Sequence, residues 1–129
     1  MQIKSDRRYS TEHLWVKVEE KTMARIGITD FAQDELGDIV YVELPHVGTE
    51  LEASDDCAVV ESVKTAVSIK SPLSGKVLEV NDNLDEEPEL VNFEPYRAGW
   101  MFIMEMADPE EIEDLLTSEE YSDKYGTGV

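Results

Sequence analysis

The sequence contains a single cysteine, Cys57, among its 129 residues. One cysteine cannot form a disulfide within the chain, so a reducing cytoplasm is the expected location. No apolar run approaches the roughly 20 residues that a helix needs to span a bilayer. The first residues, MQIKSDRRYSTEH, contain neither an apolar signal core nor an Arg- and Ser-rich amphipathic stretch. We therefore expect no export or organelle signal.

Basic residues are also scarce, 11 against 30 acidic residues, which gives a formal net charge of −19. Nucleic acids and anionic membranes would repel such a chain, so neither is expected as a partner. The charge favours basic protein surfaces instead. The length fits one domain over residues 1–129, which we expect to be a monomer.

The residues that usually carry catalysis or hold metals are not arranged for either. His13 and His46 are far apart and have no cysteine nearby, which argues against a zinc site. The acidic stretches 52–56 and 83–89 lack the glycine-centred oxygen spacing of a calcium loop. No phosphate-binding loop, dinucleotide fingerprint or nucleophile elbow is present. We expect no catalytic residue and no metal site, and we interpret Cys57 as a core residue.

Hydrophobic periodicity predicts a mainly β fold. Alternating or short apolar runs indicate strands at 13–18, 23–29, 38–45, 57–62, 65–70, 76–80 and 100–106. A short helix is expected over 29–37, capped by Thr29 or Asp30 and ended by Gly37. Segments 46–56 and 81–100 are expected to be turn-rich connections. The β core should cover about 9–107, and helical pieces should follow over about 108–125, after the cap Asp108 and Pro109.

A weak internal sequence similarity, here called the echo, relates two halves of the β region. GDIVYVEL at 37–44 resembles GKVLEVND at 75–82, and each is followed by a turn-rich loop and a short apolar strand. Many short strands at close spacing favour a sandwich or barrel. The echo favours a sandwich of two similar halves, with a hairpin at their junction.

Lys64 occupies that junction, within ESVKTA at 61–66. A lysine amine has an ordinary pKa near ~10.4, so an enzyme that acylates it must hold it and remove its proton. A side chain at the tip of a rigid, narrow hairpin suits such an enzyme. An unmodified surface lysine on a structural β sandwich is the alternative interpretation.

ESVKTA followed by SPLSGKVLEVN resembles the lipoyl-attachment segment of the glycine cleavage system H proteins. In that family a glycine lies eleven positions after the modified lysine, as Gly75 does here. The resemblance extends to most of the chain, because ITDFAQDELGDIVYVELPHVG, PELVN, PY, GW and LLTSEEY match in order. Biotin carriers flank their lysine with methionines, whereas Val63 and Thr65 stand here.

The resemblance implies a lipoyl carrier and not an enzyme, with a barrel-sandwich hybrid fold like that of lipoyl domains. Lys64 would carry lipoic acid through an amide, placed there by a lipoate-attaching enzyme. The arm would shuttle an aminomethyl group among glycine decarboxylase, aminomethyltransferase and dihydrolipoyl dehydrogenase. Glu61 is expected to be a recognition charge, and Gly75 a turn residue that needs an unusual backbone angle.

Two positions depart from the family. Leu14 replaces a glutamate before the first tryptophan, and Ser68 replaces an aspartate four places after the lysine. In the family both acids help to hold the loaded arm in a cleft, where its cationic amine favours a carboxylate. Their loss leaves an alternative open, namely an H-like lipoate-binding protein that serves a heterodisulfide-reductase-like complex in sulfur oxidation.

Overall fold

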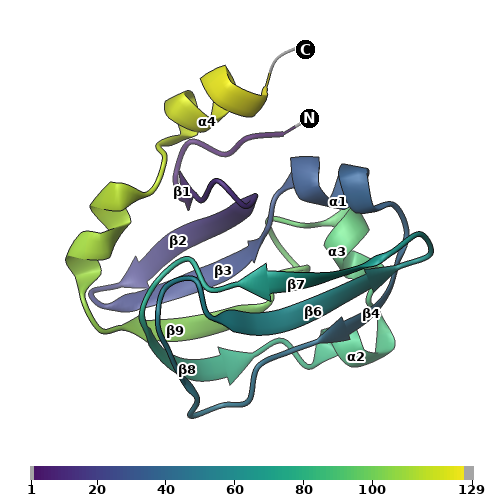
Figure 1. The fold of residues 1–129 in the computed structure, drawn as a ribbon, viewed down its shortest axis with the longest axis horizontal. Helices are drawn as coiled ribbons and strands as arrows, with labels where there is room; N and C mark the ends of the chain where they lie inside the picture. Colours follow the sequence, from purple (N-terminus) through teal and green to yellow (C-terminus); the bar gives the residue numbers. More distant parts are fainter. Residues whose placement is uncertain (1, 127–129) are drawn as a thin grey trace.

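The fold is that of a computed structural model, and the structure describes residues 2–126. Within this range the chain forms two antiparallel sheets and a few short helices (Figure 1). The larger sheet has the order β1-β2-β3-β9-β8-β5. Its strands are β1 (Arg8–Tyr9), β2 (Leu14–Glu20), β3 (Met23–Ile28), β9 (Phe102–Met106), β8 (Gly75–Val80) and β5 (Glu50–Leu51). The smaller sheet, β4-β6-β7, consists of β4 (Ile39–Glu43), β6 (Asp56–Ser62) and β7 (Ala66–Lys70).

Alternation along the strands creates the core between the sheets. In β6, for example, Ala58 and Val60 are buried while Val59 and Glu61 are more exposed, as period-two patterning requires. Apolar side chains from both sheets and from the short helices pack into one cluster. Its members include Leu14, Ile26, Ile39, Val60, Leu73, Val77, Phe102 and Met104. The two echoing segments fall into different sheets, because 37–44 contributes β4 and 75–82 contributes β8.

Helix α1 (Asp30–Leu36) forms as the sequence predicts. The side chain of Thr29 accepts a hydrogen bond from Ala32 N, which caps the N-terminus. At the other end Gly37 donates its N–H to Gln33 O and takes φ +82°, a backbone conformation that residues with a Cβ rarely adopt. The chain therefore turns sharply at Gly37 into β4.

The helical pieces after β9 are confirmed, but the first is a 3-10 helix. This helix, η1 (Pro109–Asp114), is capped by Asp108, which accepts from Glu110 N. It ends at Asp114, where Leu115 takes an extended conformation. Helix α4 (Ser118–Tyr125) follows, with a reciprocal capping box between Thr117 and Glu120. It packs beside β1, near the N-terminal segment (Figure 1).

Four elements were not expected from the sequence. Strands β1 and β5 have two residues each, too few to show alternation, and β5 lies in the expected connector 46–56. Helices α2 (Asn83–Glu86) and α3 (Leu90–Phe93) lie in the expected loop 81–100, and neither has a side-chain cap. Each inserts one apolar residue into the core, Leu84 and Val91 respectively. Over residues 2–126 no helix is long and apolar enough to cross a membrane.

Candidate functional site: the lysine-bearing hairpin

The prediction that Lys64 stands at a hairpin tip is confirmed, because β6 and β7 pair in antiparallel fashion on either side of it. Figure 1 shows this hairpin reaching past the rest of its sheet toward α1 and α3. Ser62 N donates to Thr65 O at 2.7 Å and closes the turn. Ser62 Oγ accepts from the backbone N–H groups of Lys64 and Thr65, both at 3.1 Å. The serine side chain thus orders the turn locally, and no residue of it needs a positive φ.

The turn is also tied to the segment that follows α1. Val63 N donates to Asp38 O at 3.0 Å, which joins the hairpin tip to the start of β4. The stem of Lys64 lies over Gly37, where an added Cβ would be 2.8 Å from Lys64 Cε. Lys64 is exposed, and the adjacent Val63 is 67% exposed. The result is a reachable amine on a turn whose backbone is fixed from two sides.

Glu61 lies on β6 three residues before the lysine, opposite Tyr41 and Ala66. It is exposed, and the structure gives its carboxylate no ion pair with any of residues 2–126. A partner could therefore read this charge without first breaking a contact within the protein.

The expectation that Gly75 is a turn residue with an unusual backbone angle was wrong. Gly75 is the first residue of β8 and pairs with Leu51 and Met106, and its φ is not positive. Glycine is required there for a different reason, because a Cβ would lie 2.1 Å from Glu105 O. The close approach of two backbones, and not a turn, excludes a side chain.

Leu14 and Ser68 are not brought together. Leu14 is 1% exposed and packs in the core, so in this structure it does not line an open cleft, contrary to expectation. Ser68 is exposed on β7 and lies level with Val59, which is level with Glu43 on β4. The position that departs from the family at Ser68 therefore shares a sheet face with a carboxylate.

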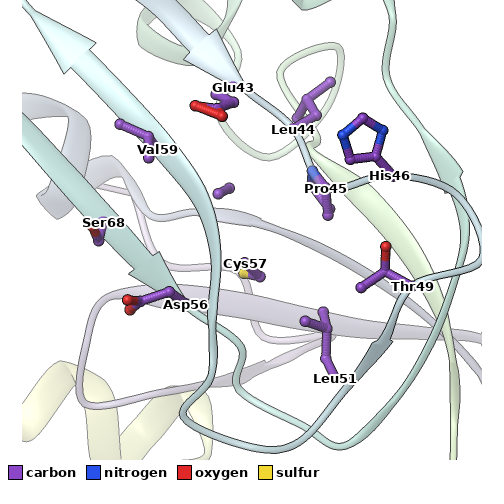
Figure 2. Close-up of a pocket in the computed structure, with 11 residues that line it drawn as sticks. Glu43, Leu44, Pro45, His46, Thr49, Leu51, Asp56, Cys57, Val59 and Ser68 are labelled. Carbon is purple, nitrogen blue, oxygen red and sulfur yellow. The ribbon is translucent and has the colours of Figure 1, made fainter.

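A pocket of about 380 Å³ borders that face, and Figure 2 shows Ser68, Val59 and Glu43 along one side of it and Pro45 and Thr49 on the other. Cys57 also lines the pocket; burial raises the pKa of its thiol to about 12, and its Sγ donates to Ile69 O. A thiol with so high a pKa is a weak nucleophile at neutral pH, in agreement with its interpretation as a packing residue. Among residues 2–126, no group of three or more His, Cys, Asp or Glu side chains is placed to hold a metal ion.

Three residues at the site were not singled out from the sequence. Ser62 could have been found, since a serine at the start of a turn commonly bonds the backbone two or three residues on. Gly37 was predicted only as a helix end, and nothing local indicated that it lies beneath Lys64. Asn92 gave no signal, although its side chain contacts the backbone of residues 37 and 39.

Comparison with known proteins agrees with this geometry. The profile of the family described as glycine cleavage H-protein matches residues 7–127. The glycine cleavage system H protein of Bacillus velezensis is 56% identical over 123 residues, covering 95% of this chain and 96% of that protein. That of Bacillus subtilis is 54% identical with the same coverage. The crystal structure of a glycine cleavage system H protein from Mycobacterium marinum superposes with a TM-score of 0.87 at 36% identity, covering 96% of this chain and 99% of that one.

Proposed function

The chain belongs to the glycine cleavage H-protein family, and from that premise we propose that lipoic acid is attached to Lys64. Family membership makes the protein a lipoyl carrier, a component of a multienzyme system that is not itself a catalyst. The mainly β, lipoyl-domain-like fold is confirmed by the likeness to a solved family member. One observation supports Lys64 above all: it is exposed at the tip of a hairpin whose backbone is held by Ser62 and Asp38.

The residues around Lys64 fit an amide-linked arm. The exposed tip leaves the amine open to an acylating enzyme, and Gly37 leaves room for the lysine stem. When bound, the dithiolane supplies the disulfide and dithiol chemistry with which the family carries an aminomethyl group among glycine decarboxylase, aminomethyltransferase and dihydrolipoyl dehydrogenase. These three enzymes and a lipoate-attaching enzyme are the proposed partners.

The departures at Leu14 and Ser68 do not require a different cargo. A cationic aminomethyl group favours a carboxylate. Glu43 lines the same pocket as Ser68 and forms no ion pair within residues 2–126, whereas Asp56, which also lines the pocket, is paired with Lys70. This face therefore retains the negative charge of Glu43. The relatives described above are all glycine cleavage H proteins, and they give no support to a carrier in sulfur oxidation. We therefore propose an aminomethyl cargo.

The decisive test is intact-mass analysis of the protein from a host supplied with lipoate. One lipoyl group should be added to the wild-type chain and none to Lys64→Arg, because a guanidinium stays protonated and cannot accept the acyl group. Lys76→Arg, which changes an exposed lysine on β8, is the control and should be modified as the wild type is. A lipoyl group that survives in Lys64→Arg would refute the assignment.

The same assay tests the proposed recognition role of Glu61. Glu61→Ala should slow lipoylation while leaving the melting temperature unchanged, because the carboxylate makes no ion pair within the described part of the chain. Lipoylation at the wild-type rate would remove Glu61 from recognition.

A further inference from the structure

A hydrogen-bond network centred on Asn92 lies behind the lysine-bearing turn. Asn92 belongs to the four-residue helix α3, and its side chain uses both kinds of group that an amide offers. Nδ2 donates to Gly37 O at 2.9 Å and to Gln33 Oε1 at 3.0 Å. Oδ1 accepts from Ile39 N at 2.8 Å. Asn92 therefore holds the chain on both sides of Asp38.

A single peptide group links Asn92 to the turn. The peptide between Asp38 and Ile39 donates its N–H to Asn92 Oδ1 at 2.8 Å. The carbonyl of that same peptide accepts from Val63 N at 3.0 Å. Hydrogen bonds in such a chain polarise and strengthen one another. Val63 directly precedes Lys64. A single peptide group therefore connects the Asn92 side chain to the residue before the lysine.

Gly37 completes the arrangement. With φ +82° and ψ −158° it occupies a region essentially restricted to glycine, and this conformation aims its carbonyl at Asn92 Nδ2. On its other side the Lys64 stem occupies the space that a Cβ would take. Gly37 thus contacts both the side chain of Asn92 and the stem of Lys64.

We propose that Asn92 is a positioning residue for the modification of Lys64, and that it acts through the Asp38–Ile39 peptide and Gly37. The proposal rests on the proposed function at Lys64. An acylating enzyme must receive the amine in one orientation, and a small misplacement of a reacting group lowers the rate strongly. The Asn92 side chain makes no hydrogen bond to the Lys64 amine, so its effect must pass through the backbone of the turn.

The chain offers a matched control in Asn81. Its side chain likewise makes three hydrogen bonds, all to backbone, donating to Ala98 O and Trp100 O and accepting from Asn83 N. These bonds hold the connection between β8 and β9, and none of them involves the hairpin tip. Asn92→Ala and Asn81→Ala therefore remove equal numbers of bonds, and only the first lies behind Lys64.

The experiment has two readouts on each variant. On unmodified protein, hydrogen exchange of the Val63 amide should be about tenfold faster in Asn92→Ala and unchanged in Asn81→Ala, after correction for global stability. The kcat/KM for lipoylation by a purified lipoate-attaching enzyme should fall roughly tenfold in Asn92→Ala and less than about twofold in Asn81→Ala. Both are measured well below the melting temperature of each variant.

Asn92→Asp guards against the possibility that the alanine variant does not fold. It keeps an oxygen for Ile39 N–H but loses both donated bonds and sets its second oxygen against Gly37 O, so both readouts should differ from the wild type in the same direction as in Asn92→Ala. Equal effects of Asn92→Ala and Asn81→Ala, or an unchanged Val63 amide, would overturn the proposal. A wild-type chain that gains no lipoyl group would overturn the proposed function instead. The exchange measurement would still decide whether Asn92 stabilises the hydrogen bond of the Val63 amide.

Discussion

At the scale of single residues, Gly75 is the position where the structure changes the interpretation most. The strand pair β8–β9 brings the Glu105 carbonyl so close that a Cβ at residue 75 would meet it at 2.1 Å. The obstructing atoms are backbone, which cannot rotate away as a side chain can. Gly48 provides a contrast, because its φ of +93° disfavours a side chain although nothing lies within 4 Å of an added Cβ.

Gly75→Ala should therefore destabilise the protein by about 3 kcal/mol, as overpacking against a fixed backbone does. Gly48→Ala should cost about 1 kcal/mol, from its backbone conformation alone. Urea unfolding at equilibrium measures both free energies. If Gly75→Ala were as stable as Gly48→Ala, the close approach would be no constraint. Lipoylation of Gly75→Ala must be compared at equal folded fraction, since loss of fold alone would reduce it.

At the scale of elements, α4 is attached to the β core through Tyr121. This side chain is fully buried and stacks on Tyr9 of β1, with ring centroids 4.6 Å apart. Its hydroxyl contacts Thr29 Oγ1 and His13 Nδ1, both at 2.9 Å. Because Thr29 also caps α1, one tyrosine couples the C-terminal helix to the helix that leads to Gly37.

Burial lowers the pKa of His13 in this packing, and the nearby charges of Glu35 and Glu12 offset this only in part. Since the folded pKa lies below the unfolded one, the unfolded chain binds the proton more readily. The stability that His13 contributes is therefore complete above about pH 6.5 and is lost as the pH falls through the folded pKa.

Urea unfolding between pH 7.5 and 5.5 should show this loss, and His13→Asn should flatten it. Asparagine is chosen because residue 13 has φ +66°, which asparagine tolerates better than most residues. Asp6 and Glu120, whose pKa values are lowered, titrate below this window. Equal pH slopes for the wild type and His13→Asn would show that His13 does not cause the dependence.

At the scale of the whole molecule, the charge imbalance dominates. The formal net charge is −19, and the ion pairs of residues 2–126 are few and partly exposed. Attachment of lipoate to Lys64 would remove one positive charge and take −19 to −20. Self-repulsion of this size opposes the compact state, and salt screens it.

The melting temperature should therefore rise as NaCl increases from low concentration to about 0.5 M, where the Debye length falls well below 10 Å. KCl at equal ionic strength is the control, since screening does not depend on which monovalent cation is present. A melting temperature that falls with salt, or that differs strongly between the two salts, would contradict an origin in self-repulsion.

The sequence alone determined those features whose causes are local. Thr29 and Gly37 bound α1 because a cap and a left-handed residue act within one turn of the helix. Lys64 was placed at a hairpin tip because the apolar alternation of 57–62 and 65–70 is interrupted there. The hydrophobic pattern likewise indicated a mainly β fold, and the residues around Lys64 indicated the family.

Only the tertiary structure decided what distant segments do to one another. The hydrogen bonds of the Asn92 side chain join residues more than 50 positions apart, and Gly75 is constrained by a backbone carbonyl of residue 105. From the sequence, Leu14 was interpreted as an altered residue of a cleft, yet the packing of the two sheets places it in the core. Each of these outcomes depends on which strands and helices become neighbours. That is set by burial of the whole apolar surface, and no local pattern of residues records it.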